Sequence, residues 1–224
     1  MNVAKLCTGT LSGYLTKAKT IFAYAIDNDL IQRNPFRQLK IQKEEVEINP
    51  LTKEELSRII QKDFRIKRLN QVRDCFVFAC YTALAYSDLA SISRDDIKVQ
   101  NGVHFIQKNR IKTGVQYTIP LNDIAMEILQ RYNYQLPVLT NQRYNSYLKE
   151  IADICGINKK LTSHMARHTF ATTVTLTNGV PIESVLKMLG HRSLKTTQIY
   201  AKIVNDKLAE DMANLSTRLQ YLAM

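Results

Sequence analysis

Residues 161–200 read LTSHMARHTFATTVTLTNGVPIESVLKMLGHRSLKTTQIY, and the polar side chains that carry chemistry are concentrated in this stretch. Its pattern predicts three helices. On the first, His164 and Arg167 are three residues apart, so an imidazole and a guanidinium lie side by side on one helical surface. Such a pair is suited to gripping a phosphate group.

The ends of these helices are marked by residues that tolerate a left-handed backbone. Asn178-Gly179 is suited to the C-terminal cap of the first helix, and Gly190 ends the second. Gly190 therefore leaves His191 on a turn. Ser193 can cap a short third helix that brings Tyr200 toward the same place.

The order His164-x-x-Arg167, then Leu189-Gly190-His191, then Tyr200 resembles the tyrosine recombinases, the integrases of phages and mobile elements. The surrounding segments ARHTFAT and GVPIESVLKMLGHRSLKTTQIYAKI are most similar to integrases of conjugative and transposable elements of the Bacteroidetes type. The resemblance covers the chain well from Leu51 to the end, and the earlier part only partially. Several spaced polar residues in one hydrophobic framework make it far more specific than a lone motif.

The resemblance implies a mechanism and assigns roles to five residues. The Tyr200 phenolate attacks one DNA strand, forms a 3′-phosphotyrosine link and releases a 5′ hydroxyl. Arg167 binds the phosphate as a bidentate fork. His164 and His191 donate hydrogen bonds or manage the tyrosine proton, and Lys112 protonates the leaving oxygen. No cofactor or metal is expected, because the phosphotyrosine conserves the bond.

One position departs from the family pattern. The segment TALAYSDLASI, residues 82–92, resembles the first catalytic box, in which an arginine stands where this chain has Ala85. Arg110 and Lys112 are two apart, so in extended chain both point to the same side of a hairpin. We therefore hypothesise that Arg110 partly replaces the missing arginine. Asp88 is interpreted as an ordinary carboxylate near a helix start.

Charge points to a polyanionic partner. The 224-residue chain has a formal net charge of +11 and a pI near 9.5. Residues 99–122 contain no acid, and between Cys155 and Asp206 Glu183 is the only acid. Each run alone could be a solvated face, but two acid-poor stretches around the candidate site favour a surface for double-stranded DNA.

Composition also bears on compartment and metal binding. No apolar run approaches the ~20 residues of a membrane span, and no signal peptide is evident, so we expect a soluble, cytoplasmic, nucleoid-associated bacterial protein. The four cysteines show no C-x-x-C spacing and are expected to be reduced. His164 and His168 form H-x-x-x-H without further zinc ligands, so His168 is interpreted as an internal hydrogen-bonding residue beside the site.

The fold class predicted is mainly α with a small antiparallel β-sheet (α+β), in two domains. Residues 1–49 are interpreted as the C-terminal part of a helical DNA-clamping (core-binding) domain plus a linker, and residues 50–224 as the tyrosine recombinase catalytic domain. Leu15 to Ile26 carry an apolar stripe that one helix cannot bury alone. We therefore expect either a shortened chain or incomplete reading frame, or a helix that folds back onto the catalytic domain.

Within residues 50–224 the periodicity predicts individual elements. Helices are expected at 53–61, 69–83, 122–134 and 141–155, and short strands at 97–99, 103–106 and 116–119. Two interpretations of the amphipathic segment 204–222 have equal weight. In the first, it packs against the core of its own chain. In the second, it docks on a neighbouring subunit.

Three functional readings follow. The first is an integrase that inserts or excises a mobile element, working as a homotetramer on paired DNA sites with possible accessory DNA-bending proteins. The second is a Xer-like recombinase that resolves chromosome dimers, or an inversion recombinase. The third is a non-catalytic DNA-binding remnant, motivated by Ala85 and the short N-terminal part. A type IB topoisomerase fits less well, because the similar segments match recombinases.

Overall fold

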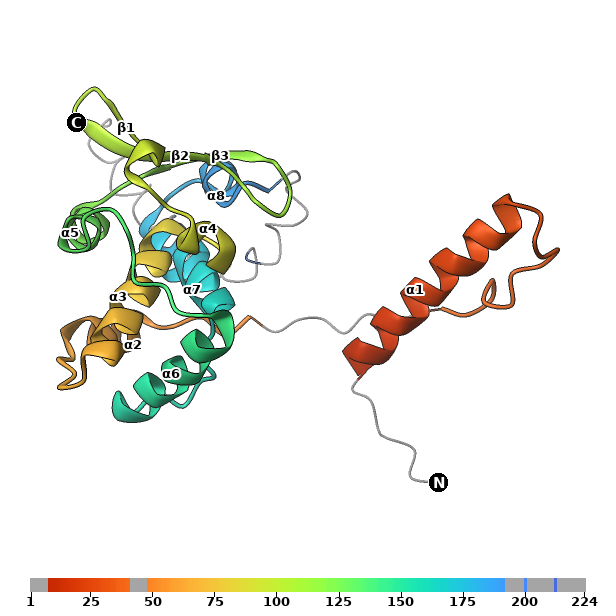
Figure 1. Ribbon diagram of the computed structural model, residues 1–224, viewed down its shortest axis with the longest axis horizontal. Helices are drawn as coiled ribbons and strands as arrows, with labels where there is room; N and C mark the ends of the chain where they lie inside the picture. Colours follow the sequence, from red (N-terminus) through yellow and green to blue (C-terminus); the bar gives the residue numbers. More distant parts are fainter. Residues whose placement is uncertain (1–7, 41–47, 192–199, 201–211, 213–224) are drawn as a thin grey trace. The chain divides into compact units, whose positions relative to one another are not determined.

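The computed structural model describes residues 8–40, 48–191, 200 and 212, and the chain divides into two compact units, Met1–Glu47 and Ile48–Met224. The smaller unit contains helix α1, Thr8–Asp27, followed by turns (Figure 1). The Phe22 and Phe36 rings pack with their centroids 5.0 Å apart. No residue of α1 is buried, and Ile21 and Tyr24 are largely exposed. The apolar stripe predicted from Leu15 to Ile26 therefore lies on a helix.

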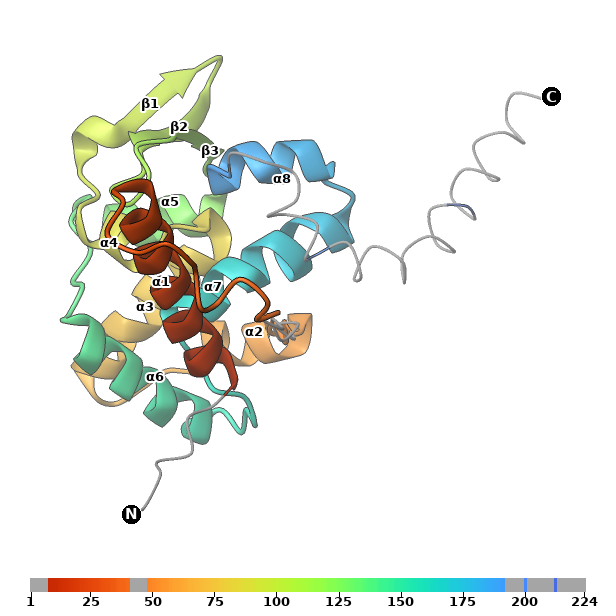
Figure 2. The same ribbon diagram turned by 90° about the vertical axis from the view of Figure 1, so that its right-hand side faces the viewer.

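The larger unit combines a three-stranded sheet with helices, which confirms the predicted fold class (Figures 1 and 2). Its regular elements are α2 Lys53–Gln61, α3 Lys67–Thr82, α4 Tyr86–Ala90, η1 Arg94–Asp96, β1 Ile97–Gln100, β2 Val103–Asn109, β3 Gln116–Pro120, α5 Asp123–Arg131, α6 Asn141–Ile154, α7 Ser163–Thr169, η2 Phe170–Thr175, η3 Leu176–Asn178 and α8 Ile182–Leu189.

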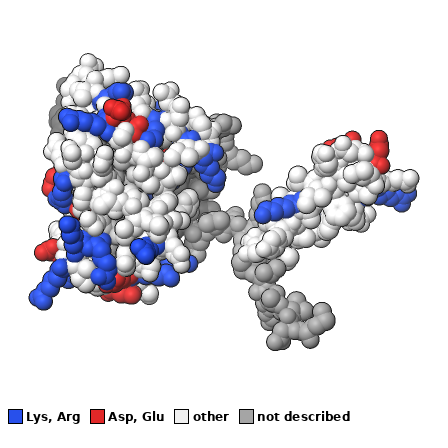
Figure 3. Space-filling view, viewed as in Figure 1, with Lys and Arg blue, Asp and Glu red and all other residues white. Residues whose placement is uncertain are grey.

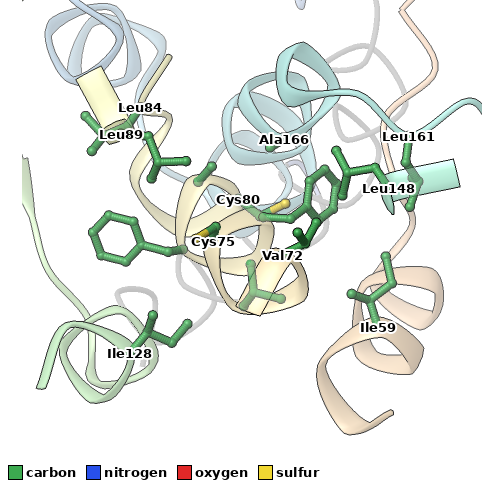
Figure 4. Close-up of a cluster of buried hydrophobic side chains, with 14 of the residues drawn as sticks. Ile59, Val72, Cys75, Cys80, Leu84, Leu89, Ile128, Leu148, Leu161 and Ala166 are labelled. Carbon is green, nitrogen blue, oxygen red and sulfur yellow. The ribbon is translucent and has the colours of Figure 1, made fainter. Parts of the chain in front are cut away.

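Helix α3 is the centre of the core. It contacts α2, α5, α6 and α7, and apolar residues from these helices surround it (Figure 4). Val72, Cys75, Phe76 and Cys80 are at most 1% exposed. Every residue of α3 from Asp74 to Cys80 is buried, so this half of the helix is covered on all sides. Burial raises the pKa of the Cys75 thiol to about 12, so this cysteine is an unreactive core residue.

Helix α2 begins at the capping box that its sequence predicts. The Thr52 side chain accepts the Glu55 N–H at 3.2 Å, and the Glu55 carboxylate accepts the Thr52 N–H at 2.8 Å. Lys159 then donates to Glu55 Oε2 at 2.6 Å and to the Pro50 carbonyl at 2.7 Å. This ion pair ties the start of the larger unit to the segment that leads into α7.

The sheet has the order β1-β2-β3 with both pairs antiparallel, as expected. Asn101-Gly102 forms the first turn, and both residues have positive φ. Strand β2 extends to Asn109, three residues beyond the predicted end, because Asn109 still pairs with Gln116. Helix α8 packs beside β3 (Figure 2). This contact places the second connection of the sheet next to the end of α8.

The helix that begins with α7 changes its hydrogen-bonding pattern halfway. It continues as the π-helical turn η2 and then as η3, and it ends at Gly179 with φ 84°. The end at Asn178-Gly179 is confirmed, whereas the π turn was not predicted. Thr172 donates to the His168 carbonyl at 2.8 Å, and Thr175 donates to the Phe170 and Ala171 carbonyls at 2.9 Å each. These hydroxyls compete with the α-helical ladder for its acceptors.

Two predicted elements lie outside the described residues. They are the short helix capped by Ser193 and the amphipathic segment 204–222, of which only Met212 is described. In the part of the chain that is described, no helix combines the length and the apolar character needed to cross a membrane.

Candidate active site

Helix α7 presents the first three side chains of the site. Thr162 caps it by accepting the Met165 N–H at 3.2 Å. His164, Arg167 and His168 follow at spacings of three and four residues, so they share one helical surface. The His164 and His168 rings meet edge to face with centroids 4.3 Å apart. The predicted pairing of an imidazole with a guanidinium is therefore present.

Arg167 is a buried cation held between two helix ends. It is 5% exposed and donates to the Ala83 carbonyl at 2.8 Å and to the Leu189 carbonyl. Ala83 caps the C-terminus of α3, and Leu189 is the last residue of α8. Helix C-termini carry partial negative charge and favour a cation there. These bonds use two of the five N–H groups of a guanidinium.

The pKa of Arg167 is lowered to about 10, first by burial and then by the nearby charge of Arg110. Arg167 still remains protonated at neutral pH. A buried guanidinium with a second cation near it gains from a bound anion.

Tyr200 is enclosed beside α7. It is 2% exposed and packs in an apolar cluster with Ala83, Phe170, Leu189 and others. Its hydroxyl lies 2.9 Å from His168 Nδ1, and the two rings meet edge to face. Burial raises the pKa of the Tyr200 phenol, and Arg167 opposes this shift. The interpretation of His168 as an internal hydrogen-bonding residue beside the site is confirmed.

The two predicted site histidines are both uncharged at pH 7. Burial lowers the pKa of His191 to about 4, with further contributions from Arg167 and Arg110. The pKa of His164 is also lowered, by loss of water around the ring and then by Arg167, Arg110 and Lys112. His191 follows Gly190, whose φ of 58° ends α8 as predicted. Uncharged imidazoles can each donate one hydrogen bond to an incoming oxygen.

The hairpin between β2 and β3 carries Arg110 and Lys112, but not in the way the sequence predicts. The argument that both point to one side assumed an extended chain, and this assumption is wrong. Strand β2 ends at Asn109, and the Arg110 carbonyl accepts the N–H groups of Thr113 and Gly114. The chain turns at Arg110, because Gly114 supplies the positive φ that the turn requires.

Arg110 nevertheless reaches the site. Its Nε lies 3.8 Å from Asp88 Oδ2, and a Cβ placed on Gly190 would approach Arg110 Cδ to 2.9 Å. The Arg110 stem therefore lies directly over the end of α8, where Arg167 bonds Leu189. Lys112 is exposed at the tip of the turn, within electrostatic reach of His164.

Asp88 is the residue of the site that sequence reasoning missed. It is 2% exposed, and its Oδ1 accepts the Ile111 N–H at 3.0 Å. Asp88 thus anchors the hairpin turn through the backbone of Ile111 and the side chain of Arg110 together. The sequence held a signal for this role. Asp88 stands three residues after Ala85, and the hairpin segment that follows is rich in cations and has no acid. Ala85 itself is the N-cap of α4 and contributes no charge.

The sequence-predicted residues therefore converge from four places in the chain. His164 and Arg167 come from α7, His191 follows α8, Arg110 and Lys112 come from the β2–β3 turn, and Tyr200 packs against His168. The described residues contain no group of three or more side chains placed to hold a metal ion. The arrangement offers cations and neutral donors to an anion, and a phenol beside them.

The model of the phage integrase family matches residues 49–206. Tyrosine recombinase XerC of Pediococcus pentosaceus is 23% identical over 229 residues, which cover 92% of this chain and 75% of that relative.

Two solved structures share the fold at 21% sequence identity. The XerH site-specific recombinase bound to difH substrate superposes with a TM-score of 0.68, over 88% of this chain and 63% of that one. The Tn1549 transposon integrase in complex with a circular intermediate DNA gives 0.69, over 88% and 76%. With the family model matched across most of the larger unit, the chain belongs to the phage integrase family of tyrosine recombinases.

Proposed function

We propose that this protein cleaves and rejoins DNA strands at specific sites through a 3′-phosphotyrosine intermediate. The observation that carries the proposal is that the Tyr200 hydroxyl meets α7 at His168, beside the buried cation Arg167, whose pKa is lowered first by burial and then by the charge of Arg110. A phosphodiester placed there brings negative charge to these cations and lies beside the phenol. The DNA-bound state of the XerH and Tn1549 structures supports the same class of partner.

Each residue has a defined part in the proposed reaction. The Tyr200 hydroxyl gives its proton to a neutral imidazole, His164 or His191, as its oxygen forms a bond to phosphorus. The bond to the 5′ oxygen breaks, and Lys112 gives that oxygen a proton. Arg167 stabilises charge on the non-bridging oxygens. His164 and His191 donate hydrogen bonds to the same oxygens. The strand is later rejoined when a 5′ hydroxyl attacks the phosphotyrosine, so no external energy source is needed.

Arg110 is proposed to supply the charge that is missing at Ala85. It is held by Asp88, one helical turn from Ala85 on α4, and it interacts electrostatically with Arg167 and with both His164 and His191. A cation in this place can reach a phosphate that Arg167 also binds. This position argues against the non-catalytic remnant, the reading that the loss at Ala85 motivated.

The biological setting is proposed from the resemblance. We propose an integrase that inserts or excises a mobile element, with the Tn1549 transposon integrase as one of its structural relatives. The XerC likeness favours the alternative of a Xer-like recombinase. In both cases we propose a homotetramer on paired double-stranded sites, possible accessory DNA-bending proteins and a bacterial nucleoid location. Figure 3 shows Lys and Arg side chains over the viewed face of the larger unit with Asp and Glu among them, and together with the net charge of +11 these cations support contact with DNA.

Covalent trapping tests the proposed chemistry. Wild type and Tyr200→Phe are incubated with nicked suicide substrates that carry candidate element ends or Xer-type sites, then run on a denaturing gel. A shifted band that Tyr200→Phe lacks is the expected result. The same band formed by Tyr200→Phe, or no band on a site that a known recombinase cleaves in parallel, contradicts the proposal.

The compensation by Arg110 has its own test. Arg110→Ala is expected to trap DNA much more slowly than wild type, and Ala85→Arg introduced into that variant is expected to restore part of the rate. The matched control is Arg94→Ala, which removes an exposed cation near β1. Equal trapping rates of Arg110→Ala and wild type would contradict the proposal that Arg110 compensates for Ala85.

A further inference from the structure

The contact between His168 and Tyr200 has no part in the mechanism above. His168 Nδ1 and the Tyr200 hydroxyl are 2.9 Å apart. The hydroxyl is the one polar atom of a side chain that otherwise packs against apolar residues such as Phe170, Leu176 and Val185. Apolar packing places a ring but does not orient an O–H bond. His168 is therefore the group that fixes the direction of this hydroxyl.

Protonation states decide which atom donates. Burial, with His164 and Arg167 nearby, lowers the pKa of His168 to about 4, so the ring is neutral at pH 7. The pKa of the Tyr200 phenol is raised, so the phenol keeps its proton. A phenol is a good donor and an unprotonated imidazole nitrogen is a good acceptor. The contact is then Tyr200 O–H donating to Nδ1, with the His168 proton on Nε2.

The placement of His168 couples this contact to the phosphate site. It is the neighbour of Arg167 on α7, and its backbone carbonyl accepts the Thr172 hydroxyl at 2.8 Å, at the start of the π turn. Its ring packs against His164, which faces the cations Arg110 and Lys112. A ring that packs against His164, on a backbone bonded by Thr172, can hold its partner in a fixed direction.

We propose that His168 is a positioning residue that holds the Tyr200 hydroxyl, protonated and aimed, beside Arg167. The role rests on the proposed function, in which Tyr200 is the nucleophile. Loss of the contact leaves the Tyr200 O–H bond free to rotate about the C–O bond and to adopt unproductive directions. Because one oriented hydrogen bond is worth a factor of roughly ten, cleavage slows by about that factor while DNA binding is unchanged.

Nitrogen-15 NMR of the whole protein tests the contact without DNA. The chain has four histidines, so single His→Asn variants assign all imidazole signals. An unprotonated Nδ1 signal of His168 that shifts in Tyr200→Phe, while His104 on β2 stays unchanged, is the expected result. A protonated Nδ1, or a signal that does not respond to Tyr200→Phe, overturns the proposal.

Single-turnover trapping with saturating nicked substrate tests the role. His168→Leu keeps the apolar volume but removes the acceptor, and it is expected to trap about tenfold more slowly. His168→Asn places an amide near the Nδ1 position and is expected to recover most of the rate. Wild-type trapping by His168→Leu refutes positioning. His168→Asn as slow as His168→Leu, with both folded by circular dichroism, assigns the loss to packing and also refutes it.

The two failures can be told apart. If wild type forms no covalent complex while the NMR shift is present, the proposed function fails and this role falls with it, although the hydrogen bond stands. If wild type traps DNA and the shift is absent, the proposed function stands and the role of His168 is wrong.

Discussion

Helix α7 and the β2–β3 turn both deliver cations to the candidate site, but they do so by opposite means. Arg167 on α7 is buried and bonded to the carbonyls at two helix ends, so it is part of the framework of the larger unit. Lys112 on the turn is exposed. Because of this difference, variants on α7 should lose stability and activity together, whereas variants at the tip of the turn should lose activity alone.

The largest effect is expected for Arg167→Ala. Two buried carbonyls lose their donor, which costs about 2–4 kcal/mol and lowers Tm by roughly 5–15 °C. Removal of the phosphate-binding guanidinium lowers the trapping rate by about 10³-fold or more. Calorimetry and single-turnover trapping measure the two losses. An unchanged Tm would show that Arg167 is not part of the framework and does not differ from Lys112 in this respect.

Lys112→Ala is expected to separate chemistry from stability. The trapping rate falls about 100-fold, because the leaving oxygen loses its proton donor, while Tm is unchanged. A substrate with a bridging 5′ sulfur should recover most of the rate, since a thiolate leaves without a proton.

Lys108→Ala is the matched control for that prediction. Lys108 donates to the Ser91 carbonyl at 2.6 Å and to Asp96 at 2.8 Å, so its loss should lower Tm and spare the trapping rate. A sulfur substrate that fails to rescue Lys112→Ala would remove Lys112 from the role of general acid.

Gly190→Ala probes the place where the turn meets α8. A left-handed φ costs an alanine about 1–2 kcal/mol, and its Cβ would stand 2.9 Å from Arg110 Cδ. We expect this loss of stability together with about tenfold slower trapping, because Arg110 must shift. Gly102→Ala has a similar φ, with no atom within 4 Å of its Cβ, and should lose stability alone. Equal trapping rates in both variants would place Arg110 away from the phosphate.

The last expected effect is a pH dependence of stability. Unfolded histidines bind protons near pH 6.5. Folded His168 and His191 bind them only near pH 4, because burial and nearby cations lower their pKa values. The unfolded state therefore binds more protons between these values, so the free energy of unfolding falls as pH decreases from about 6.5 to about 4.

Urea unfolding at several pH values measures this slope. His168→Asn and His191→Asn should each flatten it, because each removes one such histidine. Equal slopes in both variants and wild type would mean that neither histidine is held neutral by the fold.

Much of the fold could be predicted because local patterns determined it. The Thr52 capping box, the apolar helix that became α3 and the Asn101-Gly102 turn depend on neighbours in sequence, and the structure confirms them. The resemblance to the family also identified His164, Arg167, His191 and Tyr200, in one stretch of the sequence, as candidate site residues. The direction of Lys112 and the roles of these residues stay predictions.

What could not be predicted depends on distant contacts. The carbonyl partners of Arg167 lie 84 and 22 residues away, and no local pattern marks a carbonyl as an acceptor. Arg110 reached the site through a turn rather than an extended strand, and Asp88 gained its role from a backbone N–H 23 residues later. The sequence shows the threonines that accompany the π turn, but it does not show which backbone carbonyls accept hydrogen bonds from their hydroxyls.

The π turn has a consequence for the phase of the long helix around it. Hydrogen bonds from i to i+5 take in one residue more than an α-helical turn, and one residue corresponds to about 100° of rotation. Leu176, downstream of the turn, faces the Tyr200 cluster only in this phase. If all the residues stayed and the segment became a regular α-helix, Leu176 would turn away from Tyr200 by about that angle. A single-residue deletion within 170–175 would instead let the segment relax to a regular α-helix with Leu176 still on the face that meets the tyrosine. The π turn therefore accommodates one additional residue without changing which face of the helix meets Tyr200.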